Sequence, residues 1–230
     1  MRSTVAEPPE LVSVQPGATP YRLLSDPDGI PARLRPFRIG RYPVTNAEYL
    51  AYIRSASTVA APPGWKERNT APGTESHPVL VRAATDAEAY CRWLSNVLGG
   101  TYRLPQEAEW EFAAAGRDHN TFPWGDMFDP EACDSRERGL GHTCPVDAHP
   151  RGASWVGCLD MAGNAGEFCA DIYREQSAPE ASGGLDADGA LSRVVRGGSF
   201  RCDAHDVRCV SRRPAGAFDG LGTGFRVCLS

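Results

Sequence analysis

The stretch from Ser199 to Cys209, SFRCDAHDVRC, holds the densest set of chemically active side chains in this 230-residue sequence. It contains two thiols, Cys202 and Cys209, with His205 between them. Two thiolates that approach from opposite sides can hold copper(I), because soft sulfur ligands favour that ion. His205 would then offer a further, borderline ligand. The alternative is two buried thiols, since free cysteine packs as a small apolar side chain.

A second candidate site lies between Asp160 and Glu167, in the segment DMAGNAGE. The Gly-rich turn that separates the two carboxylates can direct backbone carbonyls at one point. Ligation by oxygen atoms alone, on a bent backbone, is what calcium prefers. We therefore predict a calcium ion here that braces loops rather than taking part in chemistry. The alternative is that these carboxylates only cap turns or pair with arginine.

Composition excludes several classes of function. The formal net charge of −5 argues against a nucleic-acid-binding surface. No stretch approaches the ~20 apolar residues of a membrane span, and the N-terminus lacks the apolar core of a secretory signal. We therefore expect a cytoplasmic protein whose eight cysteines are mostly thiols. If the protein were exported, disulfides would be the better interpretation.

Three helices are predicted in the first half of the chain. Thr45 starts the first with the capping-box sequence TNAE, and Thr85 repeats this device with TDAE before a helix that stops at Gly99-Gly100. The third runs from Pro105 to Gly116. It contains three glutamates at i, i+2 spacing, which point to different helix faces, so we interpret this segment as packing rather than acid–base machinery.

After Gly116 the helical periodicity vanishes, and short apolar runs alternate with Gly, Pro and Asp. Short strands set among long ordered loops are the natural interpretation. The sequence therefore predicts an α+β protein, with helices early, strands late and roughly half of the chain irregular. Loops of such length in a compact domain need something to hold them, such as function or a bound ion.

Several phrases together make the sequence similar to the formylglycine-generating enzyme (sulfatase-modifying factor) family. The resemblance covers about residues 37–228. It implies a variant of the C-type lectin-like fold, with little regular structure around a small twisted antiparallel sheet. We expect residues 1–36 to be an extended segment packed on a domain of residues 37–230. The phrases that carry the resemblance are RYPVTNAEY, AEAYCRWL, YRLPQEAEWEFAAAG, FPWGD, LDMAGNAGEF, RVVRGGSF and GFRV.

The family fold serves several functions, so the fold alone does not decide the activity. They include copper-dependent oxidation of a sulfatase cysteine, one domain of sulfoxide synthases, and ligand binding by variable proteins. The resemblance also implies two calcium sites. The first comprises the side chains of Asp160 and Glu167 with the carbonyls of Gly163 and Ala165, and the second comprises Asp134 and Asp147 with the carbonyls of Ser135 and His149.

In the oxidase branch of the family, a serine after two glycines and two cysteines form the copper centre. Ser199 and Cys202 match the serine and the first cysteine. The second cysteine is expected five residues later, where this chain has Val207. Cys209 follows instead, and it aligns better with a cysteine that has a structural role in that branch.

A second departure concerns the substrate groove, where Gly166 in GNAGEF replaces a tryptophan. Loss of the large ring would widen the groove and remove a stacking surface, which argues against a sulfatase-type peptide. For the other cysteines, the resemblance implies Cys91 and Cys228 as a pair if disulfides form. Cys133 and Cys144 are a second pair by closeness alone.

Two hypotheses follow. The first is an oxygen-dependent oxidase that acts on a thiol or another side chain of a peptide or small molecule, with Ser199, Cys202 and Cys209 as catalytic residues. The second is a non-catalytic module in which calcium-braced loops present segment 200–223 to a ligand or protein partner. His205, Arg212 and Phe218 would take part in that binding.

Overall fold

The first sheet joins the two ends of the described chain. The computed structural model describes residues 7–174, 189, 191–216 and 223–230. Four short antiparallel strands make this sheet in the order β1-β2-β7-β3. They are β1 (Leu11–Val14), β2 (Phe37–Gly40), β7 (Cys228–Leu229) and β3 (Tyr102–Arg103).

The second sheet supports the candidate site. Its antiparallel strands are β4 (Glu167–Ile172), β5 (Arg193–Arg196) and β6 (Arg212–Pro214), with β5 in the centre. The α+β class with small antiparallel sheets is therefore confirmed, and the described residues form two such sheets instead of one. The expected order of early helices and late strands holds for β4 to β7, whereas β1 and β2 precede the first helix and β3 lies between α2 and α3.

Local capping explains where the helices begin. α1 (Asn46–Ser55) starts at Thr45 with both capping-box hydrogen bonds, as predicted. α2 (Ala84–Leu98) begins earlier than predicted, and the carboxylate of Asp86 accepts from the backbone N–H of Ala83, the residue that precedes the helix. Gly99 ends α2 with a positive φ of 76°.

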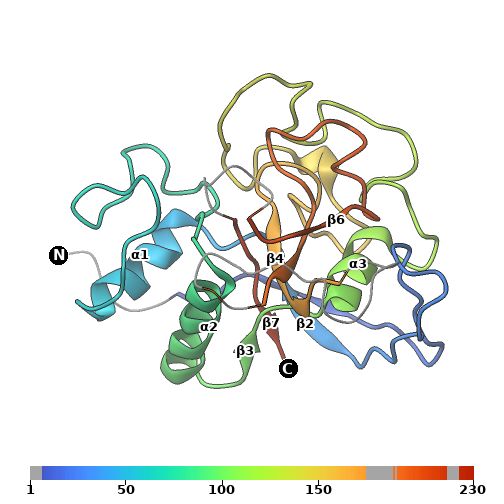
Figure 1. Cartoon of the computed structure of the whole chain (residues 1–230), viewed down its shortest axis with the longest axis horizontal. Coiled ribbons are helices and arrows are strands. Elements are labelled where there is room, and N and C mark those ends of the chain that lie inside the picture. The colour runs from blue at the N-terminus through green and yellow to red at the C-terminus, as the bar shows by residue number, and fades with distance from the viewer. Residues whose placement is uncertain (1–6, 175–188, 190, 217–222) are drawn as a thin grey trace.

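The third helix, α3 (Glu107–Ala115), starts two residues after Pro105 and ends at Gly116. A short 3-10 turn, η1 (Pro150–Gly152), is a further helical element in the described chain. Figure 1 shows α1 and α2 on one side of the strands and α3 on the other. None of the helices within the described residues is long and apolar enough to cross a membrane.

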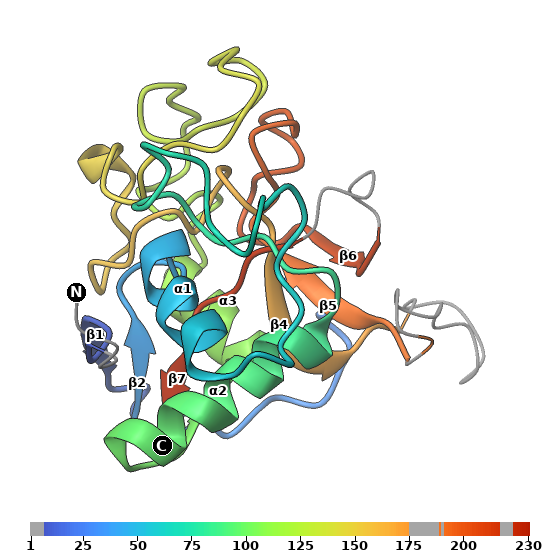
Figure 2. The same cartoon turned by 90° about the vertical axis from the view of Figure 1, so that its left-hand side faces the viewer.

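Two apolar cores pack the described helices and strands together. A third, smaller cluster, the cluster around Cys202, consists of Phe122, Cys133, Ala162, Cys202 and Val207. The aromatic rings of Tyr49, Tyr90 and Phe225 pack α1 and α2 against the chain that leads into β7. Trp110 and Phe112 of α3 centre the other core, which includes residues from β1, β2, β4 and β5. The long loops of residues 117–160 and 199–211 gather at the end of the molecule away from the C-terminus (Figures 1 and 2).

Candidate functional site

The turn that follows β5 carries Ser199 and Cys202, the two residues for which the sequence predicts a role in a copper centre. The hydroxyl oxygen of Ser199 lies 3.7 Å from the sulfur of Cys202. The backbone N–H of Cys202 donates to the Ser199 carbonyl at 2.8 Å, which closes the turn. The backbone N–H of Arg201 donates to the Ser199 hydroxyl. Both side chains are largely buried beneath the loop surface, and Cys202 is 5% exposed.

Val207 lies beside this pair. Gly198 adopts a positive φ of 68°, and a Cβ added there would lie 2.9 Å from Val207 Cγ1 and 3.3 Å from Cys202 Cβ. The two side chains therefore border the same small space. Val207 is fully buried and belongs to the same apolar cluster as Cys202.

Cys209 lies elsewhere. Its side chain belongs to the core around α3, together with Phe112 and Cys169, and not to the cluster that contains Cys202. Burial raises the pKa of the Cys209 thiol well above its usual range. The structure thus does not bring the two predicted copper sulfurs into one cluster.

A buried ion network beneath the turn was not foreseen from the sequence. The Arg196 guanidinium is fully buried and pairs with Glu107 at 3.0 Å and with Glu111 at 2.5 Å. It also donates to the carbonyl of Cys209, so it anchors the far end of the loop that begins at Ser199. The signal available in the sequence was the i, i+4 spacing of the two glutamates, which places them on one face of α3.

Arg212, a predicted binding residue, belongs to this network. Its guanidinium pairs with Glu107 at 2.7 Å and lies over the ring of Tyr173. Only 17% of its side chain is exposed, so its contacts are mainly structural. Phe218, the other predicted contact in this segment, lies outside the described residues.

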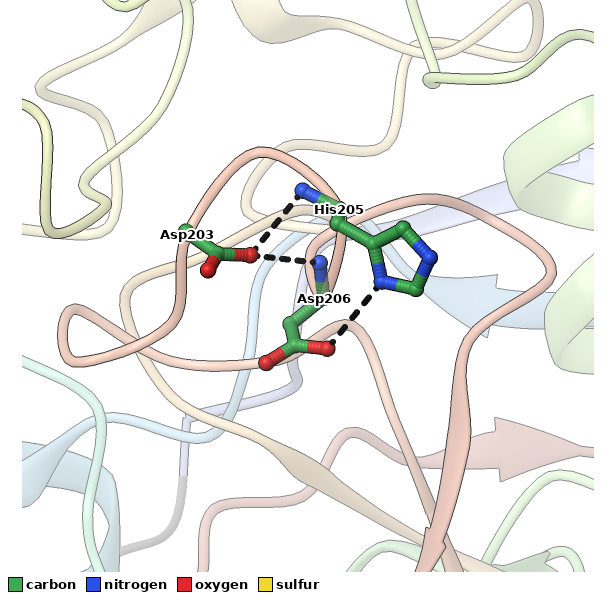
Figure 3. A group of neighbouring side chains, drawn as sticks. All are labelled: Asp203, His205 and Asp206. Atoms are coloured by element: carbon green, nitrogen blue, oxygen red, sulfur yellow. Dashed lines mark hydrogen bonds and ion pairs between the residues drawn. The ribbon is translucent and has the colours of Figure 1, made fainter.

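His205 lies in an exposed turn with Asp203 and Asp206 (Figure 3). The Asp203 carboxylate accepts from the backbone N–H groups of His205 and Asp206. The imidazole of His205 is 75% exposed and contacts Asp206 and Arg208. Because protein groups already engage these side chains, their grouping alone is no argument for a metal.

Glu167, a predicted calcium ligand, is held by protein partners. Both of its oxygens accept from the Arg226 guanidinium at 2.6 Å, and one also accepts from the Trp110 indole at 2.8 Å. All three side chains are fully buried. The alternative interpretation of this carboxylate, pairing with arginine, is the one that the structure contains.

Asp160 and Asp134 present a different environment. Asp160 accepts from the Asn164 amide at 2.7 Å, while its other oxygen is buried with no hydrogen-bond partner. Both oxygens of the fully buried Asp134 lack one as well. Burial raises the pKa of Asp134 to about 6 and that of Asp160 to about 8. Asp134 pairs with Gly163 in a β-bridge, so the structure brings one carboxylate from each predicted calcium site into one region.

The remaining predicted calcium ligands are arranged less favourably. Asp147 is exposed, whereas Asp134 is buried. The carbonyls of Ser135 and His149 accept from the backbone N–H groups of Arg138 and Gly152 within their own turns. Gly163, Ala165 and Gly166 are buried in the turn that precedes β4.

All eight cysteines are buried and free. Cys91 and Cys228 belong to different cores, and burial raises the pKa of both thiols. Cys133 lies in the cluster around Cys202, and burial raises the pKa of its thiol to about 12. Thiols with such raised pKa values are poor nucleophiles, because the thiolate is the reactive form.

The two small sheets, the three helices and the long loops are those of the formylglycine-generating-enzyme-type fold. PvdO from Pseudomonas aeruginosa shares this arrangement with a TM-score of 0.72 and 26% identity, over 96% of this chain and 94% of that one. Residues 1–230 match the sulfatase-modifying factor enzyme 1-like domain, and the chain belongs to that family.

Two relatives illustrate the range of this family. The formylglycine-generating enzyme of Thermomonospora curvata is 30% identical, over 92% of this chain and 90% of that enzyme. The hercynine oxygenase of Mycolicibacterium thermoresistibile is also 30% identical, over 87% of this chain and 52% of that protein. The chain is thus similar over most of its length to two proteins named for different reactions.

Proposed function

We propose that this chain carries out oxidase- or oxygenase-type chemistry on a peptide or small molecule other than a sulfatase cysteine. The observation that carries the proposal is the contact of 3.7 Å between Ser199 Oγ and Cys202 Sγ. It lies in a chain that matches a formylglycine-generating enzyme over nearly its full length. Gly166, in place of an aromatic side chain, supports a substrate other than the sulfatase peptide.

Within this proposal, Ser199 prepares the sulfur of Cys202. The Ser199 oxygen accepts from the backbone N–H of Arg201, and it lies 3.7 Å from the Cys202 sulfur, where either group can donate. In this proposal Ser199 is the donor, and its hydroxyl fixes the position of the Cys202 sulfur. Cys202 would therefore be the reacting or ligating sulfur, and Ser199 its hydrogen-bond donor.

A copper(I) centre with two protein thiolates does not fit these residues. Cys202 supplies one sulfur, Val207 packs beside it, and Cys209 belongs to another core. No step is therefore assigned to copper.

Calcium is a separate part of the proposal. Asp134 and Asp160 have three buried carboxylate oxygens without hydrogen-bond partners, and such hard oxygen donors suit this ion. Glu167 does not fit, because Arg226 and Trp110 engage both of its oxygens. Asp134 and Asp160 would hold the ion, which would neutralise two buried charges and join the loop around residue 134 to the turn around residue 163.

A non-catalytic binding module is the second candidate function. The valine at position 207 favours it, because a single protein thiolate lacks the partner that the oxidase branch of the family uses. In this case the calcium-braced loops, including His205, would contact a ligand or protein. A cytoplasmic location stays a prediction under both functions.

Oxygen consumption separates the two functions. The chain is incubated with a panel of free thiols and cysteine-containing peptides, and dissolved oxygen is followed for wild type, Cys202→Ser and Cys209→Ser. The proposal expects uptake by wild type and by Cys209→Ser, and none above background by Cys202→Ser. Equal uptake in all three proteins would contradict a role for Cys202. Absence of uptake from wild type with every thiol would favour the binding module.

A further inference from the structure

We propose that Val207 occupies the position of a second metal ligand beside Cys202, so that the wild-type chain has no two-thiolate copper(I) site and the single change Val207→Cys creates one. This inference concerns metal binding alone and does not require the proposed oxidase activity.

The side chains of Val207 and Cys202 border one small space around Gly198. Val207 Cγ1 and Cys202 Cβ both lie within 3.3 Å of the point where a Cβ on Gly198 would be placed. The sulfur of a cysteine at position 207 would take one of the two γ positions of valine. It would then border the same space as the Cys202 side chain, and Gly198 leaves that space open.

The turn that carries Val207 is held by backbone hydrogen bonds. The backbone N–H groups of Asp206 and Val207 donate to the Asp203 carbonyl at 2.9 and 3.1 Å. The carboxylate of Asp203 caps the same turn through the N–H of Asp206. Residue 207 is therefore held over Gly198 by backbone hydrogen bonds that do not depend on its side chain.

Cys209 cannot replace the missing ligand. Its backbone N–H donates to the Thr121 carbonyl at 2.8 Å, and its carbonyl accepts from Arg196 at 2.5 Å. These two bonds direct its side chain into the core around α3. Moving the sulfur to Cys202 would break both bonds and remove one hydrogen-bond acceptor from the buried guanidinium of Arg196.

Cys133 is the other thiol in the cluster around Cys202. It therefore needs its own control in the experiment rather than a role in the proposal.

A second thiolate changes the affinity through chelation. Binding of copper(I) to Cys202 and a cysteine at position 207 releases two thiol protons and changes no oxidation state. Because the second sulfur is already held near the first, linking the two ligands should tighten binding by ~100-fold or more.

The experiment is an anaerobic copper(I) titration of reduced protein in competition with the chromogenic chelator bicinchoninate. The variants are wild type, Val207→Cys, Val207→Ala, Val207→Cys with Cys202→Ser, and wild type with Cys209→Ser or Cys133→Ser. We expect Val207→Cys to hold one copper(I) per chain at least ~100-fold more tightly than Val207→Ala, and the added Cys202→Ser change to abolish this gain.

Two results would overturn the inference. The first is a wild-type chain that binds one copper(I) as tightly as Val207→Cys and loses it in Cys209→Ser or Cys133→Ser. The second is a folded Val207→Cys protein, checked by circular dichroism, that binds no more tightly than Val207→Ala. If Val207→Cys does not fold, the wild-type, Cys209→Ser and Cys133→Ser titrations still decide whether a two-thiolate site exists. Oxygen uptake plays no part in this readout, so it can fail independently of the proposed function.

Discussion

The change Glu167→Gln tests whether this carboxylate stabilises the fold as the partner of Arg226 or as a calcium ligand. Both side chains are 0% exposed, and two hydrogen bonds of 2.6 Å join them. Glutamine keeps the shape and one acceptor oxygen but removes the negative charge. Arg226 retains its hydrogen bonds to the carbonyls of Gly40 and Leu159, yet its charge is left buried without a counter-ion.

The magnitude follows from that burial. Removal of one partner of a buried ion pair costs about 3–5 kcal/mol, because the other charge remains desolvated. For a chain of this size, each kcal/mol lowers the melting temperature by roughly 2–4 °C. We therefore expect Glu167→Gln to melt roughly 6–20 °C below wild type. The melting temperature should fall by the same amount whether calcium or a chelator is present.

The matched control is Glu10→Gln. Glu10 pairs with Arg41 at 2.8 Å, but the two side chains are 56% and 40% exposed. An exposed pair of this kind contributes about 0–1 kcal/mol. Urea unfolding and thermal melts of the two variants give the comparison.

Combining Glu167→Gln with Arg226→Met should cost less than the sum of the two single changes, because each removes the same interaction. The reasoning is refuted if Glu167→Gln costs no more than Glu10→Gln. It is also refuted if the cost disappears when calcium is removed from both wild type and variant, since the carboxylate would then act through the ion.

Three further predictions concern the buried carboxylates and the ion network. Burial raises the pKa of Asp134 to about 6 and of Asp160 to about 8, above the ~4 of an unfolded chain. The folded chain thus holds these protons more tightly, and the unfolding free energy of calcium-free protein should fall as the pH rises from about 4 to about 8. Urea unfolding at pH 5 and at pH 8 measures this fall in the unfolding free energy. The expectation is contradicted if Asp160→Asn loses as much unfolding free energy between these two pH values as wild type does. Calcium at 100 times its Kd should add about 2.7 kcal/mol to wild-type stability. Thermal melts should show that Asp134→Asn loses this gain and that the exposed Asp147→Asn keeps it, and the reverse pattern would assign the ion to another set of ligands. Arg212→Ala should lower the unfolding free energy by about 1.5–3 kcal/mol through its bonds to Glu107, measured by urea unfolding, and a neutral effect would show that the network does not need Arg212.

The helices were predictable because their signals are local. A capping box such as that of Thr45 and Glu48 acts over three residues, and Gly99 ends a helix through its own backbone conformation. The start of α2 was misplaced because Asp86, next to Thr85, can cap a helix that begins two residues earlier, and the carboxylate of Asp86 does accept from the N–H of Ala83.

The early strands were not predictable in this way. β1 and β2 are four residues each, too short to show a clear alternation of apolar and polar side chains. Their stability comes from the pairing of β2 with β7 near the other end of the chain. Such a partner leaves no mark in the local sequence.

The sequence by itself determined the family and the helices. It also showed a valine at position 207, five residues after Cys202, where the resemblance to the oxidase branch implies a cysteine. The tertiary structure decided which side chains meet. It placed Val207 beside Cys202 and Cys209 in another core, and it joined Glu167 to Arg226 across 59 residues. The physical reason is the distance along the chain over which each kind of interaction is specified. Spacing along the chain specifies contacts within a turn or a helix, whereas the partner of a buried charge depends on how distant segments pack around it.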